Sequence, residues 1–241
     1  VFLYMEKGEM KLSIIVPCYN ESKNIPLILE KFSRVISRDD IEVLLVNNGS
    51  TDNSETVLFE LVSNYYFARI VNVNVNQGYG FGITMGLNEA KGEFIGYTHA
   101  DMQTDPADVL EALNIIEKQK NPKNCYIKGD RKGRPLIDQF FTMGMSAFET
   151  IYLGKKLWDI NAQPNIFHRN FFESLENIPK DFSLDLYFLY TAQQQDLEVI
   201  RFDVVFTQRI HGESSWNTGL ASKWKFIKRT VDFSIKLKKE L

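Results

Sequence analysis

The sequence predicts an α/β protein in which helices cover both faces of a mostly parallel central sheet. Residues 11–116 alternate between short runs of β-branched residues and segments whose apolar residues recur at helical spacing. A polar cluster follows each of the first four strand-like runs. The 241 residues are 44% apolar and 24% charged, which suffices for a buried core and excludes disordered and low-complexity classes.

The first two strand–helix units are read from apolar spacing and turn residues. Residues 12–17 are β-branched and stop at a proline, and apolar residues at helical spacing follow over 25–36. Residues 41–46 repeat the strand pattern. Residues 52–55 resemble a capping box that opens a helix over 54–62.

Two further units follow in the same order. We expect a strand over 68–75, a glycine-rich turn and helix over 78–90, and a strand over 93–98. Asp105 is a candidate N-cap with Pro106 at the first helical position. Alternation of this kind predicts parallel strands, and ligands of such sheets bind beyond the carboxyl ends of the strands.

The second half is less regular. Past residues 125–129 it predicts a helix over 136–153, a segment over 158–168 to which no element is assigned, a helix over 184–195 and a strand over 198–206. No internal repeat or linker rich in Pro, Gly or Ser marks a domain boundary.

Composition excludes several functional classes. The net charge of −3 and the pI near 5.7 argue against a nucleic-acid partner. No apolar run approaches the roughly 18 residues that span a bilayer, and residues 1–10 are too charged for a signal peptide, so we expect a cytoplasmic protein. Cys18 and Cys125 have no partner motif and are interpreted as buried thiols.

Four polar clusters, residues 17–21, 47–52, 76–80 and 99–103, follow the first four strands. Each alone is typical of an ordinary turn, but four at corresponding positions indicate a shared pocket. The glycines of 78–82 follow the third strand and lack the GxGxxG spacing, which disfavours a dinucleotide site.

His99, Asp101 and Gln103 stand at alternate positions. In an extended segment they point to one side, where they could share a divalent cation. The oxygen ligands suit Mg²⁺ or Mn²⁺, and an imidazole ligand favours Mn²⁺. His99 as a hydrogen-bonded turn residue outside the metal shell is the alternative.

These motifs resemble those of family 2 glycosyltransferases with the GT-A fold, in the dolichyl- or polyprenyl-phosphate mannose or glucose synthase branch. Residues 13–21, 46–52, 76–80 and 99–103 are similar to the opening strand, the VDDGSTD-like turn, the N-x-G-x-G turn and the metal-binding DxD segment. The G-x-R, D-x-x-x-G-F-x-x-F and R-x-x-G-E-S motifs of that branch resemble residues 129–131, 159–167 and 209–214.

The resemblance implies a Rossmann-like GT-A domain over residues 11–216. Its nucleotide-binding half would cover about 11–105 and its acceptor half about 106–216. Residues 217–241 would follow as a basic amphipathic helix. A homo-oligomer is left open.

The implied reaction is an inverting, metal-dependent transfer of a sugar from a nucleoside diphosphate sugar to an acceptor, a polyprenyl phosphate in the cytoplasmic leaflet. Three departures from the family pattern keep other functions open: His99 replaces the first Asp of DxD, Asn47 and Asn48 replace an Asp pair, and 163–164 is Gln-Pro instead of Gly-Phe. A non-catalytic nucleotide-sugar-binding protein, a transferase acting on a saccharide in cell-surface polysaccharide synthesis, and a nucleotidyltransferase are the alternatives. Because amides both donate and accept, we expect the two asparagines to favour UDP over GDP.

The resemblance assigns candidate roles residue by residue. The nucleotide-binding candidates are Pro17, Tyr19, Asn20, Glu21, Asn47, Asn48, Asn76, Gly78 and Gly80, with Tyr19 stacking on the base and Glu21 accepting a ribose hydroxyl. The metal ligands are Asp101, Gln103 and His99, and the cation is Mn²⁺ or Mg²⁺. The catalytic candidates are Asp101, Asp159, Arg131 and Arg209, and those for the acceptor or a phosphate are Arg131, Arg209, His211 and Ser214.

Asp159 is either a general base for an alcohol acceptor or a positioning carboxylate when the acceptor is a phosphate. It could instead cap a helix or turn. For Arg209 a surface ion pair is the alternative, and for His211 a hydrogen-bonded loop position.

Residues 222–241 carry six Lys and one Arg against one Asp and one Glu, a local charge of +5. Lys225, Lys228 and Lys236 group on one side of a helical wheel, and Trp224 stands in the apolar arc. This pattern is typical of a helix that lies peripherally on an anionic membrane. Alternatively, the apolar stripe packs on the domain and the charges face water.

Overall fold

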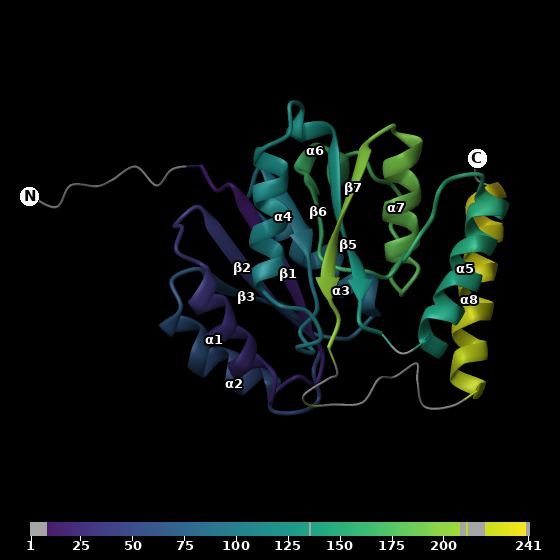
Figure 1. Ribbon diagram of the computed structural model, residues 1–241. Coiled ribbons are helices and arrows are strands. Elements are labelled where there is room, and N and C mark those ends of the chain that lie inside the picture. Colours follow the sequence, from purple (N-terminus) through teal and green to yellow (C-terminus); the bar gives the residue numbers. More distant parts are fainter. Residues whose placement is uncertain (1–8, 135, 208–210, 212–219, 240–241) are drawn as a thin grey trace, which may run out of the picture.

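A seven-stranded sheet forms the centre of the protein, with helices against both faces (Figure 1). The computed structural model describes residues 9–134, 136–207, 211 and 220–239. The strands are β1 (Leu12–Cys18), β2 (Ile41–Asn48), β3 (Ala68–Val73), β4 (Phe94–Tyr97), β5 (Cys125–Lys132), β6 (Asn165–His168) and β7 (Glu198–Val205). Their order is β3-β2-β1-β4-β6-β5-β7, and of these seven only β6 runs antiparallel to its neighbours. The predicted mostly parallel sheet is confirmed.

The predicted helices form within a few residues of their expected bounds. They are α1 (Ile25–Val35), α2 (Ser54–Leu61), α3 (Tyr79–Glu89), α4 (Ala107–Glu117), α5 (Leu136–Leu153), α7 (Leu184–Gln194) and α8 (Leu220–Lys239). The strands β5 and β6, the short helix α6 (Arg169–Glu173) and two 3₁₀ turns, Val62–Asn64 and Pro122–Asn124, were not predicted.

Two apolar clusters fill the faces of the sheet, because successive side chains of a strand point to opposite sides. Ile14 of β1 belongs to the cluster that α1, α2 and α4 cover. Ile15 belongs to the cluster that α3, α6 and α7 cover. β1 and β2 are therefore covered on both faces, as their continuous apolar runs indicate. Cys18 and Cys125 are buried and unbridged, as predicted.

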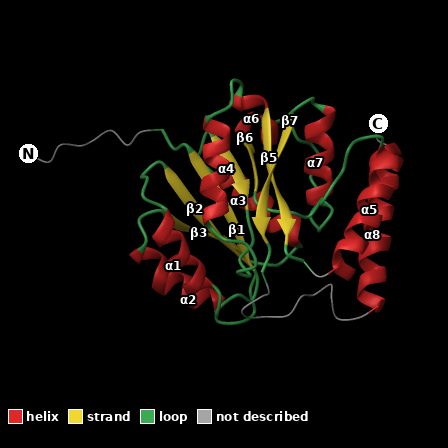
Figure 2. Cartoon of the chain, in the orientation of Figure 1, coloured by secondary structure: helices red, strands yellow, loops and turns green. Residues whose placement is uncertain are grey.

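α5 and α8 lie side by side at one end of the molecule, beyond the sheet (Figures 1 and 2). Phe233 and Leu237 of α8 pack with Leu153 of α5 and Leu189 of α7 in a third apolar cluster. Part of the apolar stripe of α8 thus packs on the domain, which is the alternative that its sequence left open. In the described part of the chain no helix is both long enough and apolar enough to cross a membrane.

The two predicted helix starts have different outcomes. The capping box at α2 is wrong: Asp52 Oδ1 accepts a hydrogen bond from the Ser54 N–H at 2.9 Å, and the helix begins at Ser54 without a side-chain cap. Asp105 does accept from the Ala107 N–H at 2.9 Å, as expected of an N-cap, although regular helix starts one residue beyond Pro106.

Candidate active site at the carboxyl edge of the sheet

The loops after β1 and β2 lie together at one edge of the sheet. Cys18 pairs with Asn47 in the parallel register, so both strands end at the same level. Asn20, in a left-handed conformation with φ of 57°, then holds the second loop. Its Oδ1 accepts hydrogen bonds from the backbone N–H groups of Thr51 at 2.8 Å and Asp52 at 3.3 Å. The first two predicted clusters are therefore one hydrogen-bonded unit.

Tyr19 and Glu21, the candidate contacts to the base and the ribose, lie in the β1 loop. Tyr19 is 46% exposed, which leaves its ring accessible for stacking. Glu21 is half-buried and accepts a hydrogen bond from Asn24 Nδ2 at 2.5 Å, while its backbone N–H donates to Ser54 Oγ at 2.9 Å. Pro17 stands inside β1, half-buried.

Asn47 and Asn48 build the turn after β2. They are 5% and 3% exposed. Asn47 Oδ1 accepts from the Ser50 N–H at 3.2 Å, and Asn47 Nδ2 donates to Asn72 Oδ1 at 3.3 Å. Asn48 Nδ2 donates to the Gly78 carbonyl at 3.1 Å. Each amide donates one hydrogen bond inside the protein, and recognition of a base by these amides stays a prediction.

The third cluster opens α3. Asn76 Oδ1 accepts a hydrogen bond from the Gly78 N–H at 2.8 Å. A Cβ placed on Gly78, whose φ is +120°, would lie 2.3 Å from the carbonyl oxygen of Lys180, and one on Gly80 would lie 2.3 Å from that of Pro179. The glycines therefore allow a close approach of the 179–181 loop. This close packing accounts for the two glycines without invoking a bound phosphate.

The fourth cluster is a bend and not an extended segment, which corrects our expectation. β4 ends at Tyr97, and Met102 has a left-handed φ of 63°. The Gln103 N–H donates to Asp101 Oδ1 at 3.1 Å, the local side-chain turn that Asp readily forms. Gln103 Nε2 donates to the Thr207 carbonyl at 3.1 Å. The alternation argument for a shared side at His99, Asp101 and Gln103 therefore fails.

The side chains of this bend still suit a divalent cation whose other ligands are phosphate oxygens and water. Asp101 is 5% exposed, and His99 and Gln103 are half-buried. In the described part of the chain, no group of three or more His, Cys, Asp or Glu side chains is arranged to hold a metal by itself. A donor set with one carboxylate matches Mg²⁺ or Mn²⁺ shared with a diphosphate.

A buried ion pair joins the end of β5 to the 159–165 loop. Asp159 Oδ2 accepts from the Arg131 backbone N–H, and Oδ1 from its Nε, both at 3.0 Å. Arg134 Nη2 lies 3.5 Å from Asp159 Oδ1. The side chains of Asp159 and Arg131 are 1% and 11% exposed. Burial alone would raise the pKa of Asp159, but the hydrogen bonds and charge of Arg131 outweigh it and lower that pKa below its ordinary value.

The last strand links this ion pair to the bend after β4. The Arg131 guanidinium lies over the Phe206 ring, 5.2 Å from its centroid. The next residue, Thr207, donates its N–H to the Gln103 carbonyl at 3.0 Å. Arg131 and the bend thus belong to one continuous edge of the sheet.

Gln163, where the family pattern has Gly, joins the two halves of the chain. It is 1% exposed, its peptide bond to Pro164 is cis, and its Nε2 donates to the hydroxyl of Tyr79 at the start of α3. The Tyr79 ring stacks on Phe182 with centroids 4.7 Å apart.

A buried polar network beneath this edge was missed by the sequence analysis. Lys128 of β5 is fully buried, and its Nζ donates to Asn165 Oδ1 and to the Ala162 carbonyl, both at 2.7 Å. Burial lowers the pKa of Lys128 to about 7. The Tyr97 hydroxyl donates to Asp185 Oδ1 at 2.7 Å, and burial raises the pKa of Asp185. The available signal was a lysine inside an otherwise apolar strand.

The late motif is described only at His211. That residue is exposed, and its backbone carbonyl accepts from Asn24 Nδ2 at 3.4 Å. Arg209 and Ser214 lie outside the described residues.

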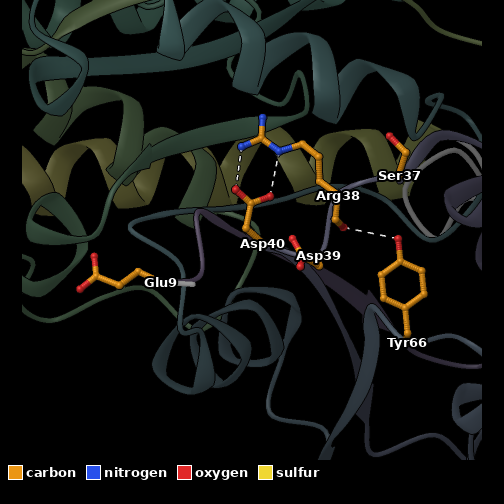
Figure 3. A pocket seen from close by; sticks show the side chains of 6 residues that line it. All are labelled: Glu9, Ser37, Arg38, Asp39, Asp40 and Tyr66. Atoms are coloured by element: carbon orange, nitrogen blue, oxygen red, sulfur yellow. Dashed lines mark hydrogen bonds and ion pairs between the residues drawn. The ribbon is translucent and has the colours of Figure 1, made fainter. Parts of the chain in front are cut away.

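An open surface pocket of about 780 Å³ lies at the opposite edge of the sheet, where β1 and β2 begin (Figure 3). Arg38 donates to Asp40 at 2.8 and 2.7 Å and lies 3.0 Å from Glu117. These charges satisfy one another, and the predicted motifs end at the other edge. We therefore place the candidate site at the carboxyl edge.

The chain is similar to known proteins in sequence. The model of the family described as "Glycosyl transferase family 2" matches residues 13–175. The undecaprenyl-phosphate 4-deoxy-4-formamido-L-arabinose transferase of Proteus mirabilis (strain HI4320) is 23% identical over 215 residues, which are 86% of this chain and 63% of that protein. The Yersinia enterocolitica transferase of the same name is 31% identical over 112 residues, 45% of this chain and 34% of its own length. These matches thus span between about a third and two thirds of each relative.

Solved structures share the fold. Glucosyl-3-phosphoglycerate synthase from Mycobacterium tuberculosis, in complex with Mn²⁺, UDP and glucosyl-3-phosphoglycerate, matches with a TM-score of 0.71 at 16% identity, over 95% of this chain and 80% of that one. The same synthase with Mn²⁺, UDP-glucose and glycerol 3-phosphate gives a TM-score of 0.71 at 17% identity, over 93% and 79% of the two chains.

Proposed function

Because the chain belongs to glycosyl transferase family 2, we propose that it transfers a sugar from a nucleoside diphosphate sugar, UDP-linked, to a polyprenyl phosphate, with inversion at the anomeric carbon. The family match confirms the resemblance that the motifs indicated. The relatives, which are undecaprenyl-phosphate sugar transferases, support the lipid-phosphate acceptor, and the UDP and Mn²⁺ bound to the structural neighbour support the donor and the cation. Such an acceptor would place the protein peripherally on the cytoplasmic face of a membrane.

One observation carries the proposal: the loops after β1, β2, β3 and β4 meet the Arg131–Asp159 pair along a single edge of the sheet. We assign the loops after β1 and β2 to the nucleoside, with exposed Tyr19 against the base and Glu21 against the ribose. The bend after β4 follows on the side of the diphosphate. Arg131 and Arg134 then face the acceptor phosphate.

Asp101, Gln103 and His99 are the residues that we propose hold a divalent cation, Mn²⁺ or Mg²⁺. Such a cation would offset the negative charge that grows on the leaving diphosphate. Asp101 supplies the carboxylate, and the Gln103 N–H fixes its orientation. The Gln103 amide is itself held by the Thr207 carbonyl.

Asp159 is better suited to positioning than to proton abstraction. Its lowered pKa and its hydrogen bonds to Arg131 make it a weak base at neutral pH. A phosphate acceptor is already anionic and needs no base, whereas a saccharide hydroxyl does. The environment of Asp159 therefore favours the phosphate acceptor. Asp159 would hold Arg131 ready to contact that phosphate in a bidentate manner.

The test is release of nucleoside diphosphate by the full chain from UDP- and GDP-sugars, with and without a polyprenyl phosphate in detergent micelles. We expect acceptor-dependent release with Mn²⁺, abolished by a chelator and by Asp101→Ala. Arg38→Ala, at the opposite edge of the sheet, serves as the control and should retain activity. Binding of UDP with Mn²⁺ but no transfer to any acceptor would contradict the proposal and leave a nucleotide-sugar-binding protein.

A further inference from the structure

One face of α5 carries a row of exposed apolar side chains. Phe140, Met143 and Ile151 are 75%, 50% and 83% exposed. With exposed Ala147 they recur at i, i+3, i+7 and i+11, which is the spacing of one helical face. Large apolar side chains gathered on one face mark an interaction surface more often than a solvated one.

The buried side of α5 faces α8, and the contacts fix how the two helices run. Ser234 Oγ meets Glu149 Oε2 at 2.5 Å, and Lys238 Nζ donates to the Tyr152 carbonyl at 2.7 Å. The later residue of α5 contacts the later residue of α8, so the two helices run parallel. Along α5, Phe140 lies about 14 Å before Glu149, and along α8, Trp224 lies about 15 Å before Ser234, at a rise of 1.5 Å per residue. These two aromatic residues therefore stand at the same level.

That level is the one at which the candidate active site lies. α5 begins shortly after Arg131 and Arg134, where β5 ends. In Figure 1 the arrowheads of β5 and β7 and the starts of α5 and α8 lie toward the same side of the molecule. An apolar surface near Phe140 and Trp224 therefore adjoins the site.

α8 adds positive charge to this surface. Lys228, Lys236 and Lys239 are exposed. Trp224 is 68% exposed and Ile235 is 37% exposed. Apolar side chains next to lysines are the chemistry that anionic lipid headgroups recognise.

We propose that the outward row of α5 (Phe140, Met143, Ala147 and Ile151) and three exposed lysines of α8 (Lys228, Lys236 and Lys239) form one docking surface for an anionic lipid bilayer. The inference rests on the proposed function, because it would bring a membrane-held acceptor phosphate beside Arg131. It changes the role expected for the C-terminal helix. Phe233 and Leu237 of α8 are used in packing, so α5 supplies most of the apolar side chains that enter the lipid.

The charge distribution favours a bilayer over a second copy of the chain. A symmetric dimer through this face would bring the same patch of both subunits together, and with it two sets of α8 lysines. The resulting repulsion would weaken such a contact. An anionic lipid surface offers the opposite charge and an apolar interior at once.

The test is flotation of the full chain with vesicles of phosphatidylcholine alone or mixed with phosphatidylglycerol, without donor or acceptor. We expect binding to the anionic vesicles that salt weakens. Phe140→Ser and Ile151→Ser should each reduce it about tenfold. Lys236→Glu with Lys239→Glu should remove the preference for anionic lipid. Phe59→Ser, at a 58% exposed position of α2, is the matched control and should bind as the parent does.

Equal binding by the parent and the α5 variants would overturn the proposal, as would equal loss in Phe59→Ser. A stable dimer in light scattering that Phe140→Ser converts to monomer would assign the face to a second copy instead. Because the vesicles contain no substrate, this result is independent of catalysis. Vesicle binding without sugar transfer would refute the proposed function alone.

Discussion

Replacing Glu149 by Gln should remove a pH dependence of stability that arises between α5 and α8. Glu149 is fully buried, and its Oε1 has no hydrogen-bond partner among the described residues. Ser234 Oγ lies 2.5 Å from its Oε2 and 2.9 Å from the Thr230 carbonyl. A hydroxyl has one proton, so if it donates to Thr230, the carboxyl group must donate to Ser234. Burial accordingly raises the pKa of Glu149 to about 7.

The size of this stability change follows from the difference in the pKa of Glu149 between the folded and the unfolded chain. The pKa rises from 4.5 in the unfolded chain to about 7 in the folded one. At 1.36 kcal/mol for each pH unit, ionisation of Glu149 costs up to about 3 kcal/mol of stability. Below pH 4.5 Glu149 is protonated in both the folded and the unfolded chain, so no stability is lost. The stabilisation declines as the pH rises above 4.5, and the full loss is reached above about pH 7.

The assay is urea unfolding of the full chain at a series of pH values between about 4.5 and 8. Glu149→Gln keeps the shape of the side chain without the titration, so its free energy of unfolding should lack this decline and exceed that of the parent at the alkaline end. Glu55→Gln, at an exposed position of α2, controls for loss of a carboxylate in general. Identical pH profiles for the parent and Glu149→Gln would refute the argument.

Three further substitutions test the candidate site. Asp101→Asn should weaken Mn²⁺ binding about tenfold or more, seen as a smaller rise in melting temperature with UDP and Mn²⁺, and an unchanged rise would exclude Asp101 as a ligand. Asp159→Asn leaves Arg131 without its buried partner, so unfolding should become about 3 kcal/mol easier in urea and sugar transfer should be lost; retention of both would remove Asp159 from the site. Gly80→Ala should cost roughly 1–3 kcal/mol in thermal unfolding because the new Cβ would lie 2.3 Å from the Pro179 carbonyl oxygen, and a neutral effect would show that the 179–181 loop moves freely.

The parts of the fold that the sequence predicted are those set by local periodicity. The β-branched runs of residues 12–17 and 41–46 indicated strands, and both form inside the sheet as β1 and β2. The helix predicted over residues 136–153 forms with those bounds. Its spacing indicated a helix but could not tell which apolar side chains would be covered, because that depends on where α8 packs.

The parts that the sequence did not predict depend on contacts between distant residues. Lys128 pairs with Asn165, and the glycines of α3 make room for the 179–181 loop, roughly a hundred positions away. The bend after β4 was missed for a local reason: an aspartate that accepts from the backbone two residues on competes with extended structure. An alternating pattern of polar residues is compatible with both a bend and an extended segment.

The three departures from the family motifs differ in their consequences for the structure and for cation binding. Asn47 and Asn48 use their amides to hold the turn after β2 and the start of α3, a role that needs hydrogen bonds and no charge. Gln163 replaces a glycine with a buried contact to Tyr79. Of the three departures, only His99 lies in the bend that we propose binds the cation, where loss of a carboxylate would remove charge that favours a divalent ion. We therefore expect His99→Asp, which restores the family motif, to tighten Mg²⁺ binding.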